Sequence, residues 1–156
     1  MTKIKQLLII ANIPSPNTQR LVNAVLKGAQ HEDIEGVNAT HIEPLKATPE
    51  DVLNADAIIL GTTENLGYLS GELKVFFDRC YYPCLEKTQG LPYCLYIRAG
   101  HDGTGATNAA KTIVTGLRWR EVQETLVCRG DFQESFISDC EELGLFMAAG
   151  LEAGII

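Results

Sequence analysis

The fold of this chain is decided by one stretch in which an apolar run passes into polar residues and glycines: Ala57-Ile58-Ile59-Leu60-Gly61-Thr62-Thr63-Glu64-Asn65-Leu66-Gly67-Tyr68-Leu69-Ser70-Gly71. The run at residues 57–60 is short and rich in β-branched side chains, which predicts a buried strand. Apolar residues then recur at helical spacing from Leu69 to Phe77, which predicts a helix over residues 72–79. In an open parallel sheet, the polar loop between such elements lies where ligands bind, although an ordinary connection has the same appearance.

A second strand end of this kind lies near the N-terminus. The largely apolar run at residues 5–11 is typical of a central parallel strand, and an amphipathic helix is predicted after it. Ser15 or Asn17 can cap this helix, and Pro16 suits its first turn. Free N–H groups at the helix start, with the side chains of Ser15, Asn17 and Thr18, can hold a phosphate without any lysine. The alternative is a capped helix that binds nothing.

The third such strand end follows the apolar residues 93–97. Gly100, Gly103 and Gly105 come shortly after this run and leave room for the backbone to approach a planar ring closely. His101, between them, can donate a hydrogen bond to a ligand or relay a proton. A polar surface residue is the alternative interpretation of this histidine.

Strands and helices alternate along the whole chain. Weaker strand patterns lie at residues 37–42 and 121–128, and Ser138 has the pattern of a cap for the terminal helix. Five strands alternating with five helical segments predict one α/β domain over residues 1–156, a three-layer sandwich around a five-stranded parallel sheet. Ligand-suited loops after the first, third and fourth strands match the flavodoxin-like strand order 2-1-3-4-5, which has its switch point between strands 1 and 3.

The composition excludes several classes of protein. Of the 156 residues, 46% are hydrophobic and 21% are charged, as in soluble globular proteins, and the formal net charge is −7. Binders of nucleic acids or anionic membranes need clustered Lys and Arg, so we expect neither partner. No segment has the length of a membrane span, and Asn12 and Pro14 interrupt the first apolar run before it resembles a secretory signal. We therefore expect a cytoplasmic protein.

The number and spacing of the cysteines indicate reduced thiols and not a metal site. They are odd in number and spread among predicted core elements: Cys80, Cys84, Cys94, Cys128 and Cys140. This distribution is typical of the cytoplasm. Cys80 and Cys84 do not have the spacing of a CxxC motif, and no second pair completes a zinc or iron–sulfur site.

The three loops together resemble those of the flavodoxin-like NAD(P)H-dependent FMN reductases and quinone reductases. Asn17-Thr18, followed by an amphipathic helix that ends in Gly28-Ala29, is similar to their phosphate loop and first helix. The stretch from Gly61 to Arg79 is similar to their second flavin loop and third helix. Residues 99–103 fit their third loop, so the resemblance covers most of the chain.

This resemblance implies FMN as the cofactor, held by residues of all three loops: Ser15, Pro16, Asn17, Thr18, Thr62, Thr63, Glu64, Asn65, Leu66, Gly67, Ala99, Gly100, His101 and Gly103. The first loop would hold the phosphate, the second would line the flavin ring, and the third would close the other side. The flavin itself would carry the hydride chemistry, so no catalytic side chain and no metal is expected.

The leading functional hypothesis is an NAD(P)H-dependent oxidoreductase that passes electrons through FMN to quinone or flavin acceptors. A flavodoxin-type electron carrier is the alternative, because an acidic protein suits docking to a basic redox partner. A flavin-free scaffold of the same fold is a third class. A phosphorylated receiver domain is excluded, since Asn12, Gly61 and Arg129 stand where its site needs acidic residues and a lysine. A homodimer is compatible with a flavin edge that a neighbouring chain completes.

Overall fold

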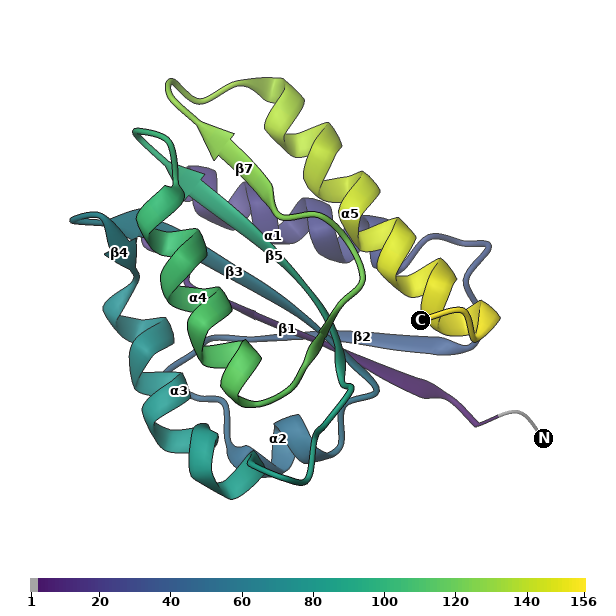
Figure 1. The fold of residues 1–156 in the computed structure, drawn as a ribbon. Helices are drawn as coiled ribbons and strands as arrows, with labels where there is room; N and C mark the ends of the chain where they lie inside the picture. Colours follow the sequence, from purple (N-terminus) through teal and green to yellow (C-terminus); the bar gives the residue numbers. More distant parts are fainter. Residues whose placement is uncertain (1–2) are drawn as a thin grey trace.

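A computed structural model describes residues 3–156 and shows one central sheet with helices on both faces (Figure 1). The elements follow the order β1 (Lys5–Ala11), α1 (Pro16–Ala29), β2 (Val37–Ile42), α2 (Pro49–Leu53), β3 (Ala57–Asn65), β4 (Tyr68–Leu69), α3 (Gly71–Cys84), β5 (Pro92–Ala99), α4 (Thr104–Gly116), β6 (Arg120–Glu121), β7 (Leu126–Arg129) and α5 (Glu134–Ala153).

The sheet has the order β2-β1-β3-β5-β6, with β7 also paired to β5 and β4 paired to β3. All of these pairings are parallel except that of β3 with β4. The predicted flavodoxin-like α/β sandwich with order 2-1-3-4-5 is therefore confirmed, and the strand count differs slightly. The predicted strand at 121–128 is two short strands, β6 and β7. The break falls at the polar residues 123–125, which have no buried face to fill at this outer position of the sheet.

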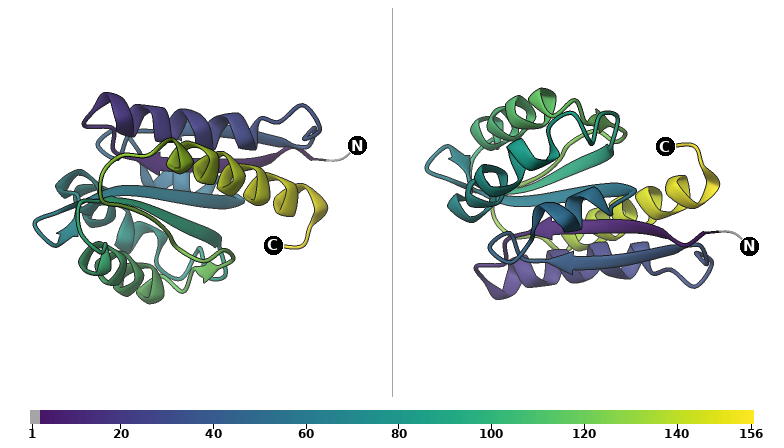
Figure 2. Two further views of the ribbon diagram at one scale, coloured as in Figure 1. Left: turned by 90° about the horizontal axis from the view of Figure 1, so that it is seen from above. Right: turned by 90° about the horizontal axis from the view of Figure 1, so that it is seen from below.

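The central strands are buried on both faces, which explains their continuous apolar runs. Leu7 and Ile9 of β1 belong to the core beneath α1 and α5, whereas Leu8 and Ile10 belong to the core beneath α2, α3 and α4. Figure 2 shows the two helical layers on either side of the sheet. Because successive side chains of a strand point to opposite faces, a strand between two helical layers needs apolar residues at every position.

Helices α1 and α5 approach each other at two glycines. A Cβ atom on Gly28 would lie 1.8 Å from the main-chain oxygen of Glu141, and one on Gly144 would lie 2.0 Å from that of Val25. Helix α5 begins at Glu134, a turn earlier than the predicted cap at Ser138, so that prediction is wrong. The earlier start lets Phe136 join the core between the sheet and these two helices.

All five cysteines are buried and free, as the sequence favours. Burial raises the pKa of the Cys80 thiol to about 12 and also raises the pKa of Cys94. Such thiols stay protonated and unreactive near neutral pH. Among residues 3–156, no group of three or more His, Cys, Asp and Glu side chains is arranged to hold a metal ion. None of the helices described has the length and apolarity needed to cross a membrane.

Candidate functional site

The three predicted loops meet at one edge of the sheet. Strands β1, β3 and β5 lie side by side and parallel, with Ala11 opposite Gly61 and Thr63 opposite Arg98. Their carboxyl ends therefore bring together the start of α1, the segment after β3 and the start of α4 (Figure 1). This is the edge at which doubly wound sheets bind ligands.

In the first loop, Ser15 and Thr18 form a closed cap at the start of α1. The main-chain N–H of Thr18 donates to Ser15 Oγ over 3.2 Å, and the N–H of Ser15 donates to Thr18 Oγ1 over 2.9 Å. The hydroxyl of Thr18 donates in turn to the carbonyl oxygen of Ser15 over 2.8 Å. Thr18 is buried, whereas Ser15, Pro16 and Asn17 are exposed. The hydroxyl of Thr18 thus serves the cap, and Ser15 and Asn17 present the polar groups that face solvent.

The second loop is a β-hairpin, so the prediction of a plain loop after residue 60 is wrong. Strand β3 continues to Asn65 and turns back into β4, with Asn65 opposite Tyr68. Leu66 and Gly67 form the turn with φ angles of 53° and 75°. Two positive φ angles define the turn type that matches the twist of a hairpin, but leucine is rarely found there, which is why the sequence pattern did not predict it. The side chain of Leu66 is fully exposed at the tip.

Two side chains of the hairpin, those of Thr62 and Glu64, fix its position. Thr62 Oγ1 accepts the N–H of Ser70 over 2.9 Å and donates to the carbonyl oxygen of Thr63 over 2.8 Å. Glu64 Oε2 accepts the N–H of Ala106 over 3.3 Å, which places its carboxylate at the start of α4. Thr62 is buried and Glu64 is half-buried. These two side chains hold the hairpin in place, so the part that is free to meet a ligand is the turn.

The structure brings Asn12 into the candidate site, where the sequence pattern did not predict it. Its Nδ2 donates to Thr63 Oγ1 over 3.1 Å, and its Oδ1 accepts the N–H of Thr63 over 3.2 Å. The side chain is 7% exposed and joins the first loop to the second. A polar residue placed directly after a buried apolar strand was the signal that could have identified it.

We expect Asn12→Ala to weaken FMN binding about tenfold and to cost about 1–3 kcal/mol of stability, because the partly buried main-chain N–H and hydroxyl oxygen of Thr63 lose their partner. Equilibrium titration with FMN and urea unfolding measure the two effects. Asn38→Ala is the control, since Asn38 makes an exposed contact with Gln6 far from the three loops. Equal FMN affinity in Asn12→Ala and the wild type would contradict the assigned role.

In the third loop, one glycine has free space beside it and another is packed against a neighbouring strand. A Cβ atom on Gly100 would meet nothing within 4 Å, whereas one on Gly103 would lie 2.8 Å from Val127 Cγ1. His101 is exposed and Ala99 is buried at the end of β5. The N–H of Thr104 donates to Asp102 Oδ1 over 3.0 Å, and this hydrogen bond lowers the pKa of that carboxyl below its usual value. The free space of this loop is therefore at Gly100.

The three loops offer the groups that FMN binding requires: a free main-chain donor for the phosphate and open space for the ring. The N–H of Asn17 has no hydrogen-bond partner among residues 3–156 and lies at the positive end of the α1 dipole, which suits a phosphate. Added Cβ atoms at Gly67 and Gly100 would meet only open space, so a flat ring has room there. Leu66, directly before Gly67, has an exposed apolar side chain that suits contact with a ring.

The sequence matches the family described as NADPH-dependent FMN reductase over residues 4–133. The chain belongs to this family. The matched range contains all three loops, and FMN, the predicted cofactor, is the cofactor of the family, which confirms both the resemblance and the cofactor.

Flavodoxins also resemble this FMN reductase family member. A flavodoxin of Aquifex aeolicus (strain VF5) is 30% identical over 112 residues, which cover 72% of this chain. The match spans 60% of the length of that protein.

Solved structures share the fold at low identity. A flavodoxin from the domain Archaea is 15% identical with a TM-score of 0.76, and the match covers 94% of this chain and 98% of that one. The two-electron reduced flavodoxin of Megasphaera elsdenii is 17% identical with a TM-score of 0.75, covering 92% and 98%. An oxidoreductase from Corynebacterium diphtheriae is 16% identical with a TM-score of 0.67, covering 97% of each chain.

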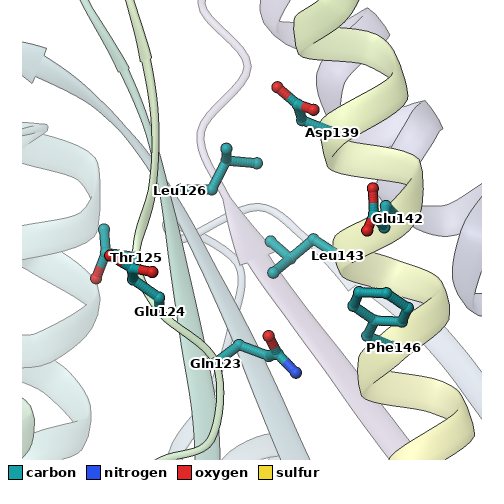
Figure 3. Close-up of a pocket in the computed structure, with 8 residues that line it drawn as sticks. All are labelled: Gln123, Glu124, Thr125, Leu126, Asp139, Glu142, Leu143 and Phe146. Carbon is teal, nitrogen blue, oxygen red and sulfur yellow. The ribbon is translucent and has the colours of Figure 1, made fainter.

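A separate hollow lies away from the three loops, between α5 and the connection from β6 to β7 (Figure 3). Its wall carries the carboxylates of Glu124, Asp139 and Glu142 beside Leu143 and Phe146. Carboxylates repel the phosphates of FMN and NADPH, and the family's loops are not part of this hollow. The edge formed by the three loops therefore remains the candidate site for the cofactor.

Proposed function

We propose that this protein is an NAD(P)H-dependent oxidoreductase that passes electrons through FMN to quinone or flavin acceptors. The observation that carries the proposal is the family match over residues 4–133, since it includes every loop of the candidate site. The family implies a nicotinamide substrate, and the choice of acceptor is part of the proposal.

The residues of the site would divide the binding of FMN between them. Ser15 and Asn17 would hold the phosphate with a hydroxyl group and a main-chain N–H at the start of α1. The turn at Leu66 and Gly67 would contact the ring, and the exposed Gly100 and His101 would border it from the third loop. Bound FMN supplies two-electron hydride chemistry.

The chain's own contribution is orientation and electrostatics. Thr62 Oγ1 accepts the N–H of Ser70, just before α3, and Glu64 Oε2 accepts the N–H of Ala106 in α4. These two hydrogen bonds hold the hairpin, so the turn is presented in one position. Fixed main-chain donors are effective because they do not need to reorganise when charge develops on a ligand. Asp102 keeps a negative charge beside the third loop over a wide pH range, since its pKa is lowered.

A flavodoxin-type electron carrier is the second candidate. The 30% identity to a flavodoxin and the formal net charge of −7 favour it. An acidic surface would steer the protein toward a basic redox partner.

For either function we propose that the protein is located in the cytoplasm, where thiols such as the five buried cysteines stay reduced. We also propose a homodimer, in which the second copy completes the pocket at the flavin edge.

The test begins with the purified protein incubated with excess FMN and desalted, followed by anaerobic addition of NADPH or NADH while the visible spectrum is recorded. We expect retained flavin that bleaches within the time of a turnover and recovers its colour when a quinone is added. Bleaching that requires a separate reductase would favour the electron carrier. A spectrum without flavin would contradict the proposed cofactor site.

A further inference from the structure

Two arginines lie against one aromatic ring beside the first loop. The Cζ atom of Arg20 lies 5.2 Å from the centre of the Phe132 ring, and that of Arg98 lies 5.8 Å from it. Arg98 Nη1 donates to the carbonyl oxygens of Ala99 and Cys128 over 2.9 and 3.1 Å, so main-chain acceptors at the ends of β5 and β7 hold this guanidinium. The partners of Arg20 are of a different kind.

Arg20 makes its hydrogen bonds with exposed side chains. Its Nη2 lies 2.6 Å from Glu134 Oε2, at the start of α5, and its Nη1 donates to Asn17 Oδ1 over 3.4 Å. The side chains of Arg20 and Glu134 are 45% and 77% exposed. Exposed ion pairs contribute little to stability, so Arg20 can exchange Glu134 for another anion at small cost.

The position of Arg20 is next to the proposed phosphate ligands. It lies one helical turn after Asn17, and the stretch from Asn12 to Arg20 contains no other cationic side chain. The contact with Asn17 already draws its guanidinium toward the start of α1. A guanidinium has five N–H donors and can bind a phosphate through two of them while it remains stacked on Phe132.

We infer that Arg20 is the cation of the FMN phosphate site and gives this site its preference for FMN over riboflavin. Glu134 holds the guanidinium beside the site in the protein without phosphate and competes with the phosphate for it. This inference rests on the proposed FMN site and adds a residue outside the three loops together with a competing carboxylate.

The test compares the affinities of FMN and riboflavin, measured by quenching of flavin fluorescence. Because riboflavin lacks the phosphate, Arg20→Gln is expected to weaken FMN about tenfold and to leave riboflavin unchanged. Glu134→Gln is expected to tighten FMN about threefold by removing the competitor, again without an effect on riboflavin. In the double variant FMN affinity should equal that of Arg20→Gln.

A second ion pair between the same two helices provides matched controls. Lys27 of α1 lies 3.9 Å from Glu141 of α5, further along the helix from the first loop. Lys27→Gln and Glu141→Gln remove the same charges and should change FMN affinity by less than about twofold. Equal losses in Lys27→Gln and Arg20→Gln would overturn the inference in favour of a general charge effect. Equal weakening of FMN and riboflavin by Arg20→Gln would overturn it in favour of a structural role.

The same titrations distinguish failure of the proposed FMN site from failure of the role of Arg20. Wild-type protein that binds neither flavin would overturn the FMN site and the role of Arg20 together. Wild-type protein that binds FMN with an affinity that Arg20→Gln does not change would overturn only the role of Arg20.

Discussion

Replacement of Gly105 by alanine is expected to displace the β3–β4 hairpin and to lower FMN affinity by about hundredfold. A Cβ atom on Gly105 would lie 1.7 Å from the main-chain oxygen of Gly67 and 2.6 Å from its carbonyl carbon. Both are backbone atoms of the turn, so no flexible side chain can move aside. The hairpin must shift by more than 1 Å to reach an ordinary contact.

The shift would also break a second contact between the hairpin and α4. Glu64 Oε2 accepts the N–H of Ala106, the residue that follows Gly105. The overpacking is expected to cost about 1–3 kcal/mol of stability, so the protein should still fold. Fluorescence titration with FMN measures the loss of affinity, and urea unfolding separates it from the loss of stability.

Gly71→Ala is the matched control for this experiment. Gly71 also lies at the start of a helix beside the hairpin, but a Cβ atom there meets nothing within 4 Å. We expect its FMN affinity to be that of the wild type and its stability to be equal or slightly higher, because alanine favours a helix over glycine. An affinity of Gly105→Ala within about twofold of the control would show that the position of the hairpin does not govern FMN binding.

Gly144→Ala is expected to have the largest effect on stability, a loss of about 3 kcal/mol, because it forces α1 and α5 apart. The Cβ atom would lie 2.0 Å from the carbonyl oxygen of Val25 and 2.9 Å from its carbon. Alanine favours a helix over glycine by about 1 kcal/mol, so a loss of stability would have to come from the helix contact. Urea unfolding and a fall of about 10 °C in Tm measure it.

The effect should be confined to stability, since this contact is distant from the three loops. In Gly28→Ala, the new Cβ atom would clash with the carbonyl oxygen of Glu141 across the same helix pair. This variant should therefore lose a similar amount of stability and keep its FMN affinity. The double variant should lose less than the sum of the two changes, because the first already separates the helices. A gain in stability from Gly144→Ala would mean that the two helices have room to move apart without loss of packing.

The central part of the fold could be predicted because it depends on short apolar runs. Residues 5–11, 57–60 and 93–97 are almost entirely apolar, and the structure buries both faces of each strand. A local pattern suffices there, since only a strand between two helical layers needs apolar side chains at every position. At the outer position the pattern is weaker, and the predicted strand at 121–128 is interrupted by its polar residues.

The hairpin could not be predicted from its own residues. Leu66 adopts a positive φ that leucine disfavours, so local preference opposes the turn. The turn is held by contacts that local sequence does not show: the hydroxyl of Thr62 on Ser70, and the carbonyl oxygen of Gly67 against Gly105. Tertiary packing supplies the free energy that overrides the local preference.

By itself, the sequence determined the central strands and the polar segments at their carboxyl ends, because hydrophobic periodicity and glycine placement are local properties. The positions of these segments then indicated the strand order. Only the tertiary structure decided which polar side chains of those loops remain free for a ligand. The hydroxyl of Thr18 and the carboxylate of Glu64 serve as helix caps. Asn12 and Arg20, the two residues that we add to the candidate site, have partners 51 and 114 positions away, and such pairings form only when the folded chain brings distant segments together.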